Sequence, residues 1–269
     1  MALLQLIAAT TLAAYTWAAR SAVMKGLSGV YQVAPYRVDP RYKVSLIAIT
    51  YNEEKYLPHL LASSHNQTEP FSEIIISDCS DNTLTASIAR QAGARVIRTP
   101  KGNLSLSRNN GARAARGEIL VFCDADVILA WDFVEKSIDA LEAGALACHP
   151  RKAYYDSQIW SFLSYVSTGI FKPNYSMTGC FTIWGDAFWG IGGFNEGCPH
   201  APYCMEDVEF SLRFREAYGR ATILLPPLAT ISARRLMKQH LTWEEWDTAV
   251  RSQRRLRCYC EVENARSLR

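Results

Sequence analysis

Residues 119–127 read Ile-Leu-Val-Phe-Cys-Asp-Ala-Asp-Val, an apolar run that ends in two carboxylates one residue apart. A short continuous apolar run is typical of a strand that is buried on both faces of a sheet. Open α/β folds bind ligands at the edge where such strands end, so Asp124 and Asp126 would face a ligand. Mg²⁺ and Mn²⁺ prefer oxygen ligands and keep positions for water and phosphates. The run predicts a metal and diphosphate site, although many strands simply end in acidic turns.

Two further apolar runs, Val44–Thr50 and Glu73–Asp78, have the same form, and each stops at polar residues. Segments with helical spacing and a following glycine separate the strands: 54–62, 83–92 before Gly93, and 106–115 before Gly117. Strand and helix in alternation predict an α/β fold with right-handed connections and a parallel sheet. The polar strand ends would then lie along one edge of that sheet.

Over residues 43–235 the chain resembles family 2 glycosyltransferases. Five motifs carry the resemblance in order: Ile49–Glu53, Ser77–Thr83, Ser107–Gly111 with Ala115–Glu118, Asp124-Ala-Asp126, and Gly192–Glu196 before Met205–Val208. The resemblance implies the GT-A fold, a Rossmann-like and mostly parallel central sheet flanked by helices. It also implies an inverting transfer from a nucleotide-diphosphate sugar with Mn²⁺ or Mg²⁺.

The same resemblance assigns the donor-binding residues. It implies that Thr50, Tyr51, Glu53 and Asp78 hold the nucleoside, that Arg108 lies near the nucleotide, and that Asp124 and Asp126 bind the metal and diphosphate. The chemistry agrees, because an aromatic ring can face a base and carboxylates can accept from its N–H groups. Taken singly, Tyr51 and Glu53 also suit an ordinary strand-end turn, and Arg108 suits a solvated helix start. The second motif departs from the family, since Ser77 and Cys79 flank Asp78 where a pair of acids and a glycine are common. Uridine and guanosine donors both stay open.

The acceptor half is expected from Gly179 onward. A strand over 179–185 should precede an apolar turn over 187–194 that lies over the donor, and Trp184 and Trp189 either stack on a sugar or belong to the core. A helix should begin at Glu206-Asp207, where the helix dipole favours acids in any case. The resemblance implies that Asp207, with Glu206 beside it, is the base that faces the acceptor hydroxyl.

Two arginines and two histidines are further candidates for the site. Residues 230–236 read as a strand or turn that leads into Arg234 and Arg235, which would close over the donor diphosphate, and Arg235 is counted among the donor-binding residues. A solvated basic helix start explains the same residues. His200 or His240 would be a further metal ligand, but a lone histidine indicates little.

The domain layout predicted from the sequence has four parts: an apolar helix over 1–25, a linker over 26–42, a GT-A domain over 43–236 that divides at 127, and a basic helical tail over 237–269. Met1–Ala19 carries no charged side chain and approaches the length of a spanning helix. The basic residues after it predict a membrane anchor with the catalytic domain in the cytosol. An interfacial helix, or one that packs on the domain, is the alternative. The tail suits anionic lipid or solvent.

The net charge of +3 gives no reason to expect nucleic acid as a partner. The predicted partners are therefore a UDP- or GDP-linked sugar, a glycan or lipid-linked acceptor with a free hydroxyl, and the membrane. One alternative is an inactive sugar-nucleotide-binding or scaffold protein, which would not need to keep Asp124, Asp126 and Asp207 together. A nucleotidyltransferase would need a glycine-rich phosphate loop after the first strand, where Tyr51-Asn-Glu-Glu54 stands instead.

Overall fold

The computed structural model of the chain describes residues 39–157, 159–161, 177, 179–197 and 206–234. The expected apolar helix, most of the linker and the basic tail lie outside these residues, as do Arg235, His200 and His240. Among the helices that are described, none is long and apolar enough to cross a membrane.

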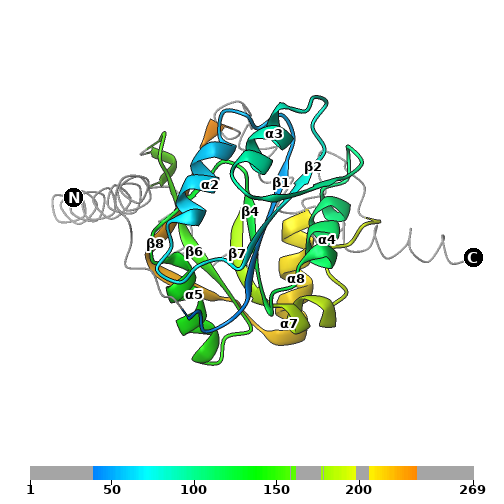
Figure 1. The fold of residues 1–269 in the computed structure, drawn as a ribbon. Coiled ribbons are helices and arrows are strands. Elements are labelled where there is room, and N and C mark those ends of the chain that lie inside the picture. The colour runs from blue at the N-terminus through cyan, green and yellow to red at the C-terminus, as the bar shows by residue number, and fades with distance from the viewer. Residues whose placement is uncertain (1–38, 158, 162–176, 178, 198–205, 235–269) are drawn as a thin grey trace, which may run out of the picture.

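The described strands form one sheet of eight strands in the order β3-β2-β1-β4-β7-β6-β8-β5 (Figure 1). The first four run parallel, and β6 also runs parallel to β8, whereas β7 and β5 are antiparallel to their neighbours. The predicted α/β class with a mostly parallel sheet is confirmed. The bounds are β1 (Val44–Thr50), β2 (Glu73–Asp78), β3 (Arg95–Arg98), β4 (Ile119–Asp124), β5 (Val127–Leu129), β6 (Ala147–Tyr154), β7 (Cys180–Trp184) and β8 (Thr222–Ile231).

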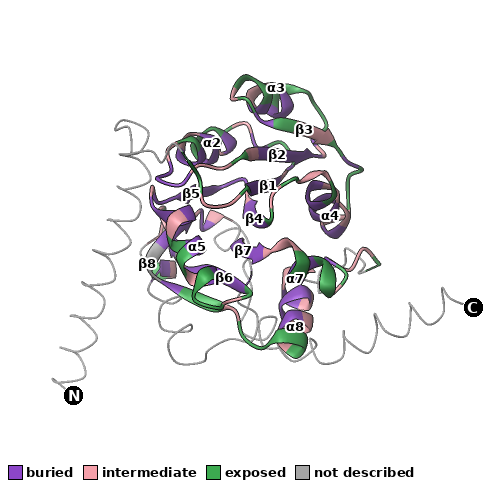
Figure 2. Cartoon of the chain, turned by 60° about the horizontal axis from the view of Figure 1, so that its bottom comes forward, coloured by how far each residue is buried: buried purple, intermediate pink, exposed green. Residues whose placement is uncertain are grey.

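Helices cover both faces of the sheet. Figure 2 shows α2 and α5 on one side and α4, α7 and α8 on the other. A cluster of aliphatic residues fills the first interface, whereas phenylalanines fill the second, with ring centroids 4.5 to 6.3 Å apart. The bounds are α2 (Leu57–His65), α3 (Leu84–Gln91), α4 (Leu104–Ala114), α5 (Phe133–Glu142), α7 (Gly185–Gly190) and α8 (Glu206–Tyr218).

Strands β1 and β2 have the bounds predicted from their apolar runs, but three other expectations need correction. Helix α2 begins at Leu57 rather than at residue 54, because Pro58 suits only a first turn. Gly117 does not end α4, which stops at Ala114. A Cβ at Gly117 would lie 2.6 Å from Ser45 Oγ and 2.7 Å from the backbone oxygen of Lys43 and the backbone nitrogen of Ser45, so this glycine allows the chain to pass close to β1.

The third correction concerns residues 187–194, which were expected as a turn over the donor. They begin inside α7, and Phe188 and Phe194 are fully buried in the phenylalanine cluster. Trp184 lies at the end of β7 that pairs with Ile119, and its ring meets Tyr42 edge to face at 5.3 Å. Because β7 is antiparallel, that end is at the opposite edge from Asp124, so Trp184 belongs to the packing. Trp189 is 39% exposed and meets Phe188 edge to face.

Strand register brings the polar ends to one edge. Thr50 is level with Asp78, and Asp78 is level with Arg98. Asp124 ends β4 opposite Gly179, whose carbonyl accepts from the Asp124 N–H at 2.7 Å. Val127 pairs with Ile231, so Asp126 and the residues after β8 emerge side by side. The carboxyl edge of the sheet therefore gathers most of the predicted site.

Candidate active site

Asp78 organises the strand ends on the nucleoside side. Its Oδ1 accepts from Thr50 Oγ1 at 2.9 Å, from the Ser80 N–H at 3.1 Å and from the Ser80 hydroxyl at 2.5 Å. Arg98 pairs with Oδ2. The carboxylate is fully buried, and Thr50 is nearly so. Both predicted residues are at the site, where they join β1, β2 and the end of β3.

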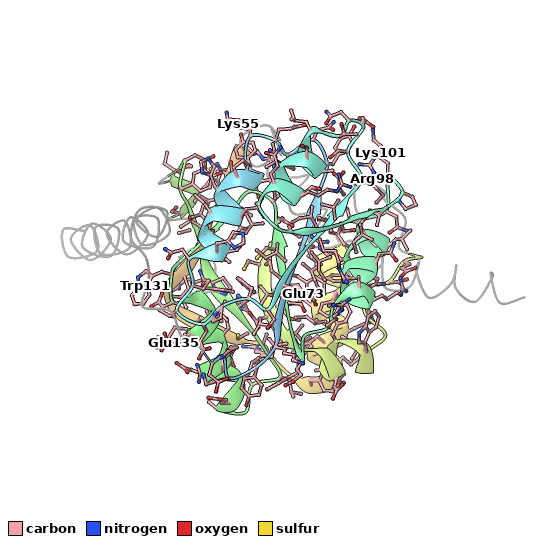
Figure 3. The ribbon with its side chains drawn as sticks, viewed as in Figure 1. Lys55, Glu73, Arg98, Lys101, Trp131 and Glu135 are labelled. Carbon is pink, nitrogen blue, oxygen red and sulfur yellow. The ribbon has the colours of Figure 1, made fainter. Side chains whose placement is uncertain are left out.

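Tyr51 lies at the exposed edge of the hydrogen-bonded group that Asp78 forms with Thr50 and Ser80. Its ring is 41% exposed, its hydroxyl donates to Asp81 at 2.5 Å, and Lys101 Nζ lies 4.3 Å from the ring centroid. The hydrogen bonds from Tyr51 and Lys101 hold the pKa of Asp81 below its usual value. Figure 3 shows Lys101 beside Arg98, far from Glu73 at the start of β2. The sequence did not indicate Arg98 or Lys101 as site residues, because the register of β3 against β2 is what brings them to this edge.

Arg108 joins the two halves of the predicted site. It lies on α4, whose first turn is capped by the side chain of Asn103. Its Nη2 lies 3.1 Å from Asp124 Oδ1, and its Nη1 pairs with Glu206 at the start of α8. Burial lowers the pKa of Arg108, but the charges of Glu206, Asp124 and Asp207 outweigh it and raise the pKa. This guanidinium is a permanent cation among three predicted site acids.

A second arginine holds the other candidate metal ligand. Arg234 Nε lies 3.0 Å from Asp126 Oδ2, and Nη2 lies 2.6 and 2.8 Å from the two oxygens of Glu53. The ring of Tyr56 lies 4.1 Å from its Cζ. Burial lowers the pKa of Arg234, but its hydrogen bond to Glu53 and the charge of Asp126 outweigh this effect and raise the pKa overall. The sequence favoured Arg235, which is outside the described residues, whereas Arg234 is the residue found at the site.

Asp207 lies in the first turn of α8, next to Glu206. Its Oδ1 accepts from the N–H of Val208 at 2.8 Å, and its backbone oxygen accepts from the Ser211 hydroxyl at 2.7 Å. Asp207 is close enough to Arg108 to raise the pKa of that guanidinium. The predicted base and the predicted metal ligand Asp124 therefore share one cationic neighbour.

Asn109 fixes the acceptor half against α4. Its Nδ2 donates to Phe194 O at 2.8 Å and to Glu196 Oε1 at 2.7 Å, while its Oδ1 accepts from the Phe194 N–H at 2.9 Å. Asn109 is buried, and it sits directly after Arg108 in the chain. Before the structure, the motif Ser-Arg-Asn-Asn was the one sign that Asn109 has a role here. The structure assigns its arginine to the acids and its first asparagine to the Gly-Gly-Phe turn.

Tyr154, at the end of β6, is also close to Asp126 and was not predicted. Burial raises the pKa of its hydroxyl to about 12, and the charge of Asp126 adds to the effect. The phenol therefore stays neutral at physiological pH, and Asp126 has an uncharged neighbour on this side.

The acids at this edge suit a hard divalent cation. In the part of the chain that the structure describes, no group of three or more His, Cys, Asp or Glu side chains is arranged to hold a metal. Asp124 and Asp126 provide two carboxylates, and Mg²⁺ or Mn²⁺ is commonly held by one or two carboxylates while phosphates and water complete its shell. The donor set fits such an ion once a diphosphate is present.

Comparison with known proteins agrees with this geometry. The sequence profile of glycosyl transferase family 2 matches residues 45–195, more than half of the chain. The chain belongs to glycosyl transferase family 2. The resemblance seen in its motifs is thereby confirmed, and with it the expectation of a transferase.

Individual relatives cover less of the molecule. The 4,4'-diaponeurosporenoate glycosyltransferase of Staphylococcus haemolyticus is 39% identical over 93 residues, which are 32% of this chain and 24% of that protein. The TPR repeat-containing protein Synpcc7942_0270 of Synechococcus elongatus is 33% identical over 105 residues, 38% of this chain and 25% of that protein. The chain therefore matches about a quarter of the length of these relatives.

Solved structures of low sequence identity share the GT-A fold. Staphylococcus aureus TarS superposes with a TM-score of 0.59 and 18% identity, over 77% of this chain and 42% of TarS. A structure of its residues 1–349 is a complex with UDP-GlcNAc, with a TM-score of 0.57 and 19% identity over 71% and 58% of the two chains. The mannosyltransferase PcManGT of Pyrobaculum calidifontis, in complex with GDP-Man and Mn²⁺, has a TM-score of 0.56 and 20% identity over 85% and 68%.

Proposed function

We propose that this chain transfers a sugar from a nucleotide-diphosphate donor to an acceptor hydroxyl, with inversion at the anomeric carbon and with a divalent cation. The observation that carries the proposal is the pairing of Arg108 with both Asp124 and Glu206. This contact sets the carboxyl end of the donor-side strand β4 beside the start of α8, where Asp207 lies. The residues proposed to bind the diphosphate and the residue proposed as general base would then belong to one site.

On the donor side, the exposed ring of Tyr51 is available to the base of a nucleotide. It follows Thr50, which is hydrogen-bonded to Asp78. Lys101 and Arg98 add positive charge to this edge, which favours a phosphorylated ligand. TarS and PcManGT are known with UDP-GlcNAc and GDP-Man, which supports a nucleotide sugar as donor. The donor screen decides whether the nucleoside is uridine or guanosine.

The proposed chemistry is a single displacement. As the acceptor oxygen bonds to the anomeric carbon, the bond from that carbon to the diphosphate oxygen breaks, and Asp207 takes the acceptor proton. A divalent ion held by Asp124 and Asp126 would offset the charge that develops on the leaving diphosphate. Arg108 supplies fixed positive charge at the same place. Because one step suffices, the configuration at the carbon inverts.

The proposals for the acceptor and for the location of the enzyme rest on the sequence alone. The apolar segment 1–25, the basic residues after it and the arginine-rich tail support association with a membrane, with the catalytic domain on the cytosolic side. A glycan or lipid-linked acceptor is consistent with that position.

A donor screen tests the proposal. The full-length protein is incubated with a panel of UDP- and GDP-sugars and Mn²⁺, and released nucleoside diphosphate is measured, with and without candidate acceptors. We expect release by the unchanged protein and a loss of about 10²–10⁴-fold in transfer by Asp207→Asn, the usual contribution of a positioned base. Nucleotide affinity should stay within a few fold. Asp186→Asn, an exposed acid in the first turn of α7, is the matched control and should behave like the unchanged protein.

Three results would contradict the proposal or a part of it. Binding of a nucleotide sugar with no turnover on any donor and acceptor would indicate an inactive binding protein. Formation of pyrophosphate from a nucleoside triphosphate and a sugar phosphate would indicate a nucleotidyltransferase. Full transfer by Asp207→Asn would remove Asp207 from the role of base.

A further inference from the structure

We propose that Arg234 is a resident cation at the metal position, which neutralises Asp126 while no nucleotide is bound and leaves this carboxylate when nucleotide and metal bind together. The inference deepens the proposed function and rests on it. It concerns how this chain keeps a buried carboxylate stable before its ligands arrive.

Three separate segments meet at this guanidinium. Arg234 follows β8, Asp126 follows β4, and Glu53 follows β1. Nε of Arg234 contacts Asp126 at 3.0 Å, and its Nη2 contacts both oxygens of Glu53 at 2.6 and 2.8 Å. The side chain of Asp126 is 3% exposed and that of Glu53 is 9% exposed. Two nearly buried negative charges thus both pair with Arg234.

Burial makes such a partner necessary. A carboxylate that is removed from water is strongly disfavoured unless a cation or hydrogen-bond donors compensate its charge. Arg234 supplies that compensation for both Asp126 and Glu53. A divalent ion at Asp126 would repel the guanidinium and compete for the same carboxylate. Arg234 must therefore weaken the affinity of the site for a metal ion that arrives alone.

A nucleotide offers Arg234 a new partner. The side chain of Arg234 is 21% exposed, whereas that of Arg108 is 7% exposed between Asp124 and Glu206. Arg234 is thus the more accessible of the two guanidiniums to an incoming ligand. A guanidinium binds phosphate oxygens with two parallel hydrogen bonds. Transfer of Arg234 to the diphosphate would release Asp126, so nucleotide and metal should each raise the affinity for the other.

The test measures Mn²⁺ binding in the absence of nucleotide, by the EPR signal of free Mn²⁺, for the full-length protein and for Arg234→Ala and Arg234→Gln. We expect both variants to bind Mn²⁺ about fivefold more tightly or better, at the low end of typical coupling between sites. Structural damage would act in the opposite direction and weaken binding. Arg113→Ala is the matched control, because it removes the same charge from an exposed pair with Glu196 and should leave Mn²⁺ affinity unchanged.

A second substitution locates the effect. Adding Asp126→Asn to Arg234→Gln should abolish the gain, whereas a gain that survives would place the ion elsewhere and overturn the inference. Equal or weaker Mn²⁺ affinity in both Arg234 variants would also overturn it. Thermal unfolding confirms that each variant is folded, and the glutamine, which keeps much of the side chain against Tyr56, carries the test if the alanine is unstable.

The inference and the proposed function can fail separately. Mn²⁺-dependent release of nucleoside diphosphate by the unchanged protein, together with unaltered Mn²⁺ affinity in the Arg234 variants, would refute the exchange and keep the transferase. Tighter Mn²⁺ binding in the variants without release from any donor would support the exchange and refute the transferase.

Discussion

The ion pair of Arg108 with Asp124, an expected metal ligand, is far more buried than the surface pair of Arg113 with Glu196. Arg108 is 7% exposed where it meets Asp124, while Arg113 is 51% exposed where it meets Glu196. Removing one partner of a buried pair leaves an uncompensated charge, which costs about 3–5 kcal/mol, whereas exposed pairs contribute about 0–1 kcal/mol. We therefore expect Arg108→Ala to lower the free energy of unfolding by about 3 kcal/mol or more. Denaturant unfolding of this variant and of Arg113→Ala measures the difference, and equal losses would contradict it.

Glu196 makes the stability of the fold depend on pH. Its burial raises the pKa, but hydrogen bonds from Asn109 and Arg113 outweigh this effect and lower the pKa below its usual value of 4.5. A group with a lowered pKa in the folded state contributes stability above its unfolded pKa and loses it as the pH falls through the folded pKa. Between about pH 6 and about pH 3, the unchanged protein should therefore lose more unfolding free energy than Glu196→Gln. Parallel pH profiles of the two proteins would disprove this linkage.

Among the elements, α4 does most to join the two halves of the site. Arg108 reaches Asp124 and Glu206, and the next residue, Asn109, makes three hydrogen bonds to the turn after α7. Leaving buried donors and acceptors without partners costs about 1–3 kcal/mol for each group. We expect Asn109→Ala to destabilise the fold by about 2–3 kcal/mol, and to weaken transfer, because the acceptor half loses its fixed position on α4.

Asn110→Ala is the control for this substitution, since Asn110 is partly exposed and its side chain accepts a hydrogen bond from the exposed Arg113. It should change the unfolding free energy by less than about 0.5 kcal/mol, as ordinary surface substitutions do. Similar losses for the two asparagines, measured by denaturant unfolding, would mean that the turn is held by its phenylalanines alone.

Elements also differ in how far the sequence predicts them. Strands β1, β2 and β4 are continuous apolar runs between polar residues, and all three lie in the middle of the sheet, so local pattern and burial agree. Strand β3 has only two apolar residues, β6 contains His-Pro-Arg-Lys, and β8 contains two prolines, so their pairing depends on distant neighbours. For the same reason, Arg98 and Asn109 could not be recognised as site residues from the sequence. Their roles require the register of β3 and the position of the turn.

At the scale of the whole molecule, the second half of the sheet, β7, β6, β8 and β5, completes the site. The parallel half positions Asp124, and the pairing of β5 with β8 carries Arg234 to Asp126. The sequence predicted both aspartates because they follow one apolar run, but the local pattern offered no reason to choose Arg234 over Arg235. That choice is a property of the assembled sheet, where Arg234 contacts acids from two other segments.

In the proposed site, this edge of the sheet binds a nucleoside diphosphate together with a divalent cation through Asp124 and Asp126. The decisive measurement is calorimetric titration of UDP and GDP into the full-length protein, in Mn²⁺ and in EDTA, with Asp126→Asn as the variant and Asp186→Asn as the control. We predict that one of the two nucleotides binds in Mn²⁺, that EDTA or Asp126→Asn weakens this binding by at least about tenfold, and that Asp186→Asn leaves it unchanged. A nucleotide affinity that is the same in EDTA and in Asp126→Asn as in the unchanged protein with Mn²⁺ would contradict the account.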